Sequence, residues 1–161
     1  MKSTWNQDYS NTPERVWAYL AGIIDGEGHI GLKKIMCKAS LNPTYFMSLT
    51  ITNTNPLLMA WLKDNIGGNV NIDHRKGNEH RHKPSLTWYA SARKAVPILE
   101  RCLPFLVVKA EQAKIVLAMQ SLTKGKPYKA ISPEMAARRE LMYLELRALN
   151  KRGPKGAEQI Q

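Results

Sequence analysis

Hydrophobic and polar residues follow two periods along the chain, and each period predicts a different kind of element. Apolar residues at helical spacing predict helices at about 13–24, 57–66, 92–103, 109–123 and 133–150. Alternating apolar and polar residues predict strands at about 29–38, 45–53, 69–75 and 85–91, paired in two hairpins. We expect Thr12 and Ser132 to cap helices, Asn55 to begin the second helix, and the glycines within 25–28 to end the first. This order predicts an α+β fold, an α-β-β-α-β-β-α unit followed by additional C-terminal helices.

The length and composition fit one domain. The chain has 161 residues, of which 43% are hydrophobic and 23% charged, which is enough for one core but short for two domains of ordinary size. Within this single domain, 1–161, we expect a core at about 12–123, a C-terminal helix at about 133–150 and a loose basic tail at 151–161. No apolar run approaches the roughly 20 residues of a membrane-spanning helix, so we expect no membrane partner. Cys37 and Cys102 offer no disulfide framework.

The charge of the chain points to a polyanionic partner. Lys and Arg number 24 against 13 Asp and Glu, for a formal net charge of +11. From His29 to Asn55 the charged residues are Lys33, Lys34 and Lys38, with no acid among them. Because this region alternates like strands rather than like an amphipathic membrane helix, nucleic acid is favoured over a membrane surface. A basic face that only keeps the protein soluble is the alternative.

The end of the first predicted helix carries the candidate chemistry. Ala18, Ala21 and Gly22 make one stripe of this helix nearly flat, and a glycine inside a helix costs about 1 kcal/mol relative to alanine. Close approach of the same helix in a second copy would offset that cost and give a two-fold dimer. Asp25 and Glu27 would then lie beside the dimer axis, where they could hold a divalent metal. In the alternative, these acids only end the helix and Gly22 packs inside one subunit.

The string LAGIIDGEG at 20–28 resembles the LAGLIDADG signature of the homing endonucleases, with Ile23, Gly26 and Glu27 as the replaced positions. Three further segments resemble the same family in the same order: SLTITNTN at 48–55, GGNV at 67–70 and LPFLVVKAEQA at 103–113. The resemblance covers about 19–122. It implies a four-stranded antiparallel, saddle-shaped sheet that lies along the major groove of double-stranded DNA. It also implies a homodimer whose signature helices pack face to face on a long, roughly palindromic site.

The same resemblance implies a metal site at the end of the signature helix. Glu27 would bind a catalytic Mg²⁺, with the Gly26 carbonyl as a backbone ligand, and other divalent cations such as Mn²⁺ or Ca²⁺ can occupy such a site. Asp25 would brace the ends of the helices rather than bind metal. The implied dimer interface consists of Ala18, Ala21, Gly22 and Asp25.

Two further residues complete the implied catalytic group. Lys109 falls where the family places a basic residue that organises the active-site water, and Asn55 where it places a polar residue close to that water. The chain departs from the pattern at Leu58 and Met59, where some members carry a second basic residue. The resemblance thus implies Mg²⁺-dependent cleavage of both DNA strands, with Glu27, Asn55 and Lys109 as catalytic residues.

Strand alternation predicts which residues face the DNA groove. Val70, Ile72, Leu86, Trp88 and Ala90 suit the core, so their neighbours should face outward. The histidine-containing loop between the second pair of strands has no nearby Cys, so we expect phosphate contacts there rather than zinc. The predicted DNA-binding residues are His29, Lys33, Ser48, Thr50, Thr52, Asn69, Asn71, Asp73, Arg75, Arg81, Lys83, Thr87 and Tyr89.

Two rival functions remain open from the sequence. A binding protein of the same fold without cleavage, either an RNA-splicing maturase or a transcription regulator, would share the sheet and the charge. A basic ribosome-associated protein would explain the charge but not the signature helix. A bacterial or archaeal cell, a chloroplast or a mitochondrion would each suit such a protein, so the sequence leaves the compartment open.

Overall fold

The computed structural model has the order of helices and strands that the sequence predicts. It describes residues 8–36, 42–73, 84–91, 94–123 and 131–151. The elements are α1 (Glu14–Glu27), β1 (Gly28–Ile35), β2 (Thr44–Asn53), α2 (Pro56–Asn65), β3 (Asn69–Asp73), β4 (Ser85–Ser91), α3 (Ala95–Cys102), the 3-10 turn η2 (Leu103–Phe105), α4 (Ala110–Thr123) and α5 (Pro133–Leu149). The predicted α+β fold class is therefore confirmed. Within the described ranges, no helix is both long and apolar enough to cross a membrane.

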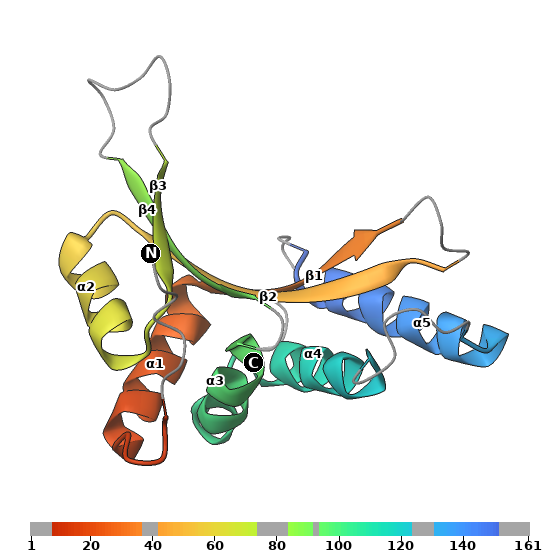
Figure 1. Ribbon diagram of the computed structural model, residues 1–161, viewed down its shortest axis with the longest axis horizontal. Coiled ribbons are helices and arrows are strands. Elements are labelled where there is room, and N and C mark those ends of the chain that lie inside the picture. The colour runs from red at the N-terminus through yellow and green to blue at the C-terminus, as the bar shows by residue number, and fades with distance from the viewer. Residues whose placement is uncertain (1–7, 37–41, 74–83, 92–93, 124–130, 152–161) are drawn as a thin grey trace, which may run out of the picture.

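The four strands form one antiparallel sheet in the order β1-β2-β4-β3. The sheet curves, and its β3–β4 end rises away from the helices (Figure 1). Helices α1, α3, α4 and α5 lie beneath the convex face, while α2 lies beside the β3–β4 end (Figure 1). No described helix covers the concave face, so one side of the sheet faces the core and the other faces solvent.

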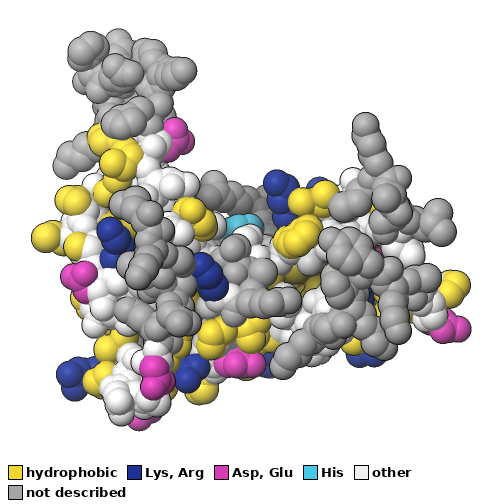
Figure 2. All heavy atoms as spheres, in the orientation of Figure 1, with side chains coloured by type: hydrophobic (Ala, Val, Ile, Leu, Met, Phe, Trp, Pro, Cys, Tyr) yellow, Lys and Arg dark blue, Asp and Glu magenta, His cyan; other side chains and the backbone are white. Residues whose placement is uncertain are grey.

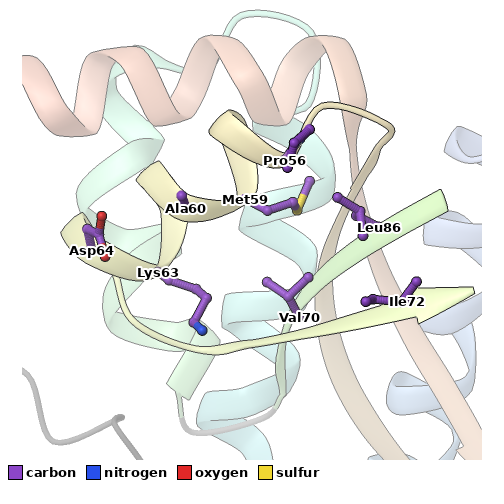
Figure 3. A pocket seen from close by; sticks show the side chains of 8 residues that line it. All are labelled: Pro56, Met59, Ala60, Lys63, Asp64, Val70, Ile72 and Leu86. Carbon is purple, nitrogen blue, oxygen red and sulfur yellow. The ribbon is translucent and has the colours of Figure 1, made fainter. Parts of the chain in front are cut away.

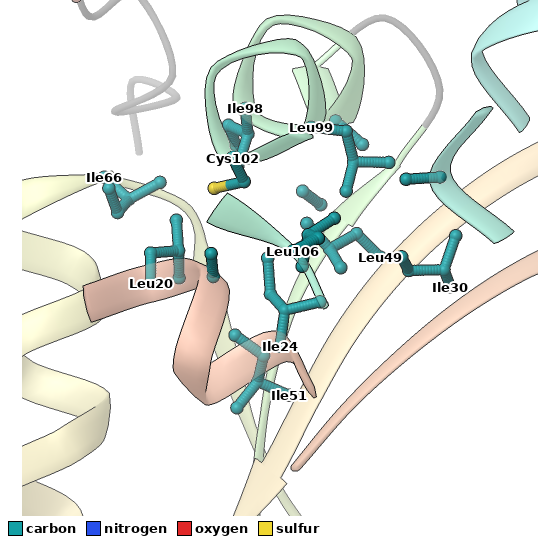
Figure 4. Close-up of a cluster of buried hydrophobic side chains, with 14 of the residues drawn as sticks. Leu20, Ile24, Ile30, Leu49, Ile51, Ile66, Ile98, Leu99, Cys102 and Leu106 are labelled. Atoms are coloured by element: carbon teal, nitrogen blue, oxygen red, sulfur yellow. The ribbon is translucent and has the colours of Figure 1, made fainter. Parts of the chain in front are cut away.

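The core lies between the convex face of the sheet and the helices (Figure 4). Ile51 and Trp88 are paired across β2 and β4, and both are fully buried. Leu20 and Ile24, four residues apart on α1, pack in the same cluster. Replacing any of these large buried side chains by alanine typically costs about 2–5 kcal/mol, so the cluster fixes where the end of α1 lies against the sheet.

The connection from α2 to β3 depends on two glycines. Gly67 and Gly68 have φ angles of 83° and 104°, in the left-handed region that L side chains rarely adopt. The Gly67 carbonyl accepts a hydrogen bond of 2.7 Å from the indole N–H of Trp88, so the polar atom of this buried ring is satisfied. The turn and the core of the sheet are thereby tied together.

The limits of α1 differ from the prediction. Pro13, rather than Thr12, is the N-cap residue, and the Thr12 N–H donates to the Tyr9 carbonyl at 3.1 Å. The helix does not stop before Asp25 but continues to Glu27, and Gly28 leaves it with extended backbone angles. A Cβ at Gly28 would lie 2.7 Å from both the Cα and the carbonyl oxygen of Ile24. Gly28 is therefore required by this close contact.

Helix α5 is fastened to the outer end of the sheet. Ser132 caps it as predicted, its hydroxyl accepting from the Met135 N–H at 3.2 Å. The Glu140 carboxylate accepts from the Lys34 ammonium at 2.6 Å and from the Tyr45 hydroxyl. At the other end of the helix the Asn150 side chain donates to the Ile30 carbonyl at 2.8 Å, on the edge strand β1.

Candidate active site and nucleic-acid interface

The Asp25 carboxylate joins the end of α1 to the start of α4. It accepts hydrogen bonds from the backbone N–H groups of Val107, Val108 and Lys109 at 2.8, 3.2 and 2.9 Å. Burial acts to raise the pKa of this carboxyl, but the three N–H groups and the Lys109 ammonium outweigh it and hold the pKa below its ordinary value. Asp25 is thus an ionised brace between two helices, and its oxygens are occupied by these bonds.

The Lys109 side chain returns to the same helix end. Its Nζ donates to the Ile24 carbonyl at 2.8 Å and to the Asp25 carbonyl. Burial lowers the pKa of this ammonium, and the carboxylates of Asp25 and Glu27 act in the opposite direction. The Ile24 carbonyl also accepts from the Gly28 N–H, and a cation at these last-turn carbonyls complements the negative end of the helix dipole.

Glu27 ends α1 with an exposed side chain, next to the exposed Gly26. No cluster of three His, Cys, Asp or Glu residues that could enclose a metal occurs in the part of the chain that the structure describes. Mg²⁺ does not require one, because it keeps several waters and is commonly held by one or two carboxylates together with substrate phosphates. The oxygens of one carboxylate and one backbone carbonyl at this position fit such an ion.

Asn55 lies at the same end of the sheet, but its side chain has a structural role. Gly28 pairs with Ile51, so the end of β2 at Asn53 lies beside the end of α1. The Asn55 Oδ1 accepts from the Leu57 N–H at 3.0 Å and caps α2, which leaves the side-chain NH₂ as its donor group. The Asn53 Oδ1 accepts from the Asn55 N–H at 2.9 Å.

The outward side of α1 differs in one residue from the expected interface. Ala18 and Gly22 are exposed, and nothing lies within 4 Å of a Cβ built at Gly22. Ala21, which we expected in the interface, is fully buried in the core of the subunit. Its position on the helix turns it toward the sheet rather than along the 18–22 stripe. Next to the braced helix end, Val107 and Val108 are 86% and 69% exposed.

The strand register gathers the predicted DNA-binding residues on the concave face. His29 pairs with Thr50, Thr50 with Tyr89, and Tyr89 with Asn69, so these four side chains form one row across the sheet. Figure 2 shows a histidine and basic side chains in the hollow above the helices. The remaining described members share this face: Lys33, Ser48, Thr52, Asn71, Asp73 and Thr87. Arg75, Arg81 and Lys83 lie outside the described residues.

The inward face of the β3–β4 end is less buried than predicted. Ile72 was expected in the core but is 57% exposed, and Val70 and Leu86 are half-buried. They line an open groove of about 410 Å³ against Met59 and neighbouring residues of α2 (Figure 3). The β3–β4 end extends past α2 (Figure 1), and α2 covers Ile72 only in part.

Comparisons with known proteins agree on the fold. No family model matches the sequence, and no curated protein does. The homing endonuclease I-CvuI, in complex with its target in the presence of Ca, superposes with a TM-score of 0.69 at 21% identity, covering 88% of this chain and 85% of that one. The archaeal intron-encoded homing endonuclease I-Vdi141I, complexed with DNA, gives 0.69 at 15% identity and 86% coverage of both chains. The LAGLIDADG homing endonuclease I-SmaMI, bound to cleaved DNA, gives 0.66 at 15% identity, covering 84% of this chain and 45% of that one. The chain therefore has the fold of the LAGLIDADG homing endonucleases.

Proposed function

We propose that this chain is a homing endonuclease of the LAGLIDADG family, which acts as one domain per subunit and as a homodimer. It binds a long, roughly palindromic site in double-stranded DNA and cuts both strands with Mg²⁺. The observation that carries the proposal is the exposed Glu27 at the end of α1, near enough to the Lys109 ammonium to act on it electrostatically. The fold supports it, because the similar structures include proteins in complex with DNA.

The exposed side of α1 supports the homodimer. Gly22 costs helix stability, and a Cβ built there would have no described atom within 4 Å beyond its own stretch of helix, so the position leaves room for the close approach of a second helix. Val107 and Val108 expose apolar surface beside the same helix end, where a second copy would cover it. Since each subunit contributes one Glu27, two copies supply one acidic centre for each DNA strand. The chain spans about half of I-SmaMI, which fits a pair of such units.

Each residue of the centre has a distinct task. When bound, Mg²⁺ would polarise the scissile phosphate and lower the pKa of a bound water. Glu27 would hold the ion through its carboxylate and Gly26 through its carbonyl. Lys109, fixed by the carbonyls at the end of α1, keeps a positive charge near the phosphate where negative charge develops. The Asn55 Oδ1 is used by the capping bond, so the side-chain NH₂ group is the donor that orients the attacking water.

The test compares Glu27→Gln with Glu14→Gln, which changes an exposed glutamate at the opposite end of the same helix. Wild type and Glu14→Gln should enrich and cut the same sequences from a randomised duplex pool in Mg²⁺, and EDTA should abolish cutting. Glu27→Gln should bind the enriched duplex in Ca²⁺ but cut it about a hundredfold more slowly or worse. Equal cutting by Glu27→Gln would refute the mechanism. Sequence-specific binding without cutting by wild type in any divalent cation would instead assign a maturase or regulator.

A further inference from the structure

One exposed apolar side chain, Phe46, lies among the polar residues of the concave face. Phe46 is 44% exposed and pairs across the sheet with Lys33 on β1. Along β2 its neighbours on the same face are Thr44 and Ser48, both polar. Among the described strand residues, Phe46 is the one large exposed hydrophobic side chain that the register places on this face.

The exposure of Phe46 is fixed by the residues on either side of it. Tyr45 and Met47 are buried on the opposite face, against the helices. A shift of one residue in the register would bury Phe46 but would expose both of them. The Tyr45 hydroxyl also donates to Glu140, which ties this side of β2 to α5. The phenyl ring therefore faces the concave side and cannot turn into the core.

The surroundings of Phe46 suit a DNA groove. From Gly28 to Asn53 the sequence contains no acidic residue, and Lys33 lies directly opposite the ring. The diagonal neighbour Gly31 has no side chain, and the His29 Nε2 lies 2.7 Å from where its Cβ would be. The His29 ring thus occupies the space that a side chain at position 31 would need. This end of the sheet presents cationic and neutral groups, which are complementary to phosphates.

We propose that Phe46 reads a thymine by contacting its 5-methyl group in the major groove, an inference that rests on the proposed function. On the major-groove edges of the four bases, the C5-methyl of thymine is the apolar group, and phenylalanine is among the side chains that contact it. From Thr50 to Phe46 the chain runs four residues along β2. At about 3.3 Å per residue this is about 13 Å, or about four base pairs. The thymine therefore lies about four base pairs farther from the cleavage centre than the base that His29 and Thr50 face.

The test uses duplexes enriched from a randomised pool, resynthesised with uracil in place of each thymine in turn. Uracil lacks only the methyl group and pairs normally. Titrations in Ca²⁺ measure affinity without cutting. For wild type, uracil in place of one particular thymine of a half-site should lower the affinity about fourfold. The same change in both half-sites should lower it about fifteenfold. Phe46→Ser should show no loss at that position, and its own enriched pool should lose the thymine preference there. Phe46→Leu should keep part of the sensitivity, because it retains an apolar contact.

Leu141→Ser serves as the matched control, because Leu141 is 66% exposed on α5, away from the concave face. It should keep the wild-type response to uracil. If wild type enriches and cuts a site but responds to uracil as Phe46→Ser does at every thymine, this inference fails while the proposed function stands. If wild type enriches and cuts no sequence, the proposed function fails and the inference fails with it.

Discussion

Replacing Asp25 tests the brace between α1 and α4 without touching the proposed metal ligand. Asp25→Ala removes the acceptor of three backbone hydrogen bonds. A hydrogen bond to a charged group contributes about 1.5–3 kcal/mol, and loss of a helix cap costs about 0.5–2 kcal/mol. Because the carboxylate is partly exposed, water can take its place as the acceptor. We therefore expect the free energy of unfolding to fall by about 2–3 kcal/mol rather than by the sum of these contributions. For a chain of this size the Tm should fall by about 4–12 °C.

The pH dependence separates the charge from the shape of the side chain. The pKa of Asp25 in the folded protein lies below its ordinary value, so its stabilisation is complete above the unfolded-state pKa near 3.8. It is lost as pH falls through the lower pKa of the folded state. Asp25→Asn, which resembles the protonated acid, should therefore be less stable than wild type at pH 7, and the gap should shrink below about pH 4.

Guanidinium unfolding followed by tryptophan fluorescence at pH 7 and pH 3 measures this gap. Asp64→Asn, at an exposed acid on α2, is the matched control and should unfold like wild type at both pH values. A gap between wild type and Asp25→Asn that is as large at pH 3 as at pH 7 would refute the role of the charged carboxylate.

Four further substitutions test the end of α1 and the attachment of α5 to the sheet. Gly22→Leu has open space for its side chain and should gain up to about 1 kcal/mol of helix stability. The variant should nevertheless sediment as a monomer with its DNA, and a stable dimer would contradict the proposed packing of the two helices. Gly28→Ala should lower the Tm because its Cβ would meet backbone at 2.7 Å, whereas Gly26→Ala, with nothing within 4 Å, should raise it slightly; equal shifts would show that the contact is unimportant. Glu140→Ala removes a partly exposed ion pair with Lys34 and the acceptor of the Tyr45 hydroxyl. It should speed amide hydrogen exchange in α5 and β1 and lower the Tm modestly, mainly through the lost Tyr45 hydrogen bond; unchanged exchange would argue against this attachment.

The parts of the fold that the sequence predicted are those that local periodicity controls. The fourth strand begins and ends where alternation placed it, at Ser85 and Ser91. The end of α1 was misjudged because glycines at 26 and 28 resemble a turn, while the structure keeps the first in the helix. The helix continues past Gly26 and ends at Gly28 because Gly28 lies close to Ile24 and because Asp25 bonds to residues about 80 positions away. No local sequence pattern reveals these contacts.

The candidate site, too, was predicted from the sequence only in part. Alternation placed His29, Thr50 and Tyr89 on one face, and the pairing of the strands agrees. Phe46 escaped notice because Tyr45, Phe46 and Met47 form an apolar run, and such a run does not reveal which member faces outward. The sequence predicted Asn55 only as the start of a helix. That its Oδ1 is used to cap α2 follows from the hydrogen bond with the Leu57 N–H, which the sequence does not reveal.

The glycines of the signature helix give the strongest physical reason for proposing a partner. Gly28 is explained within one subunit, because any side chain there would collide with the backbone of Ile24. Gly22 and Gly26 have no such explanation, since both are exposed and a Cβ at either would have no described atom within 4 Å beyond its own stretch of helix. Each costs about 1 kcal/mol relative to alanine in a helix, and the subunit gains no contact in return. A second subunit that approaches α1 closely would explain Gly22, and a ligand that binds the backbone at Gly26 would explain Gly26.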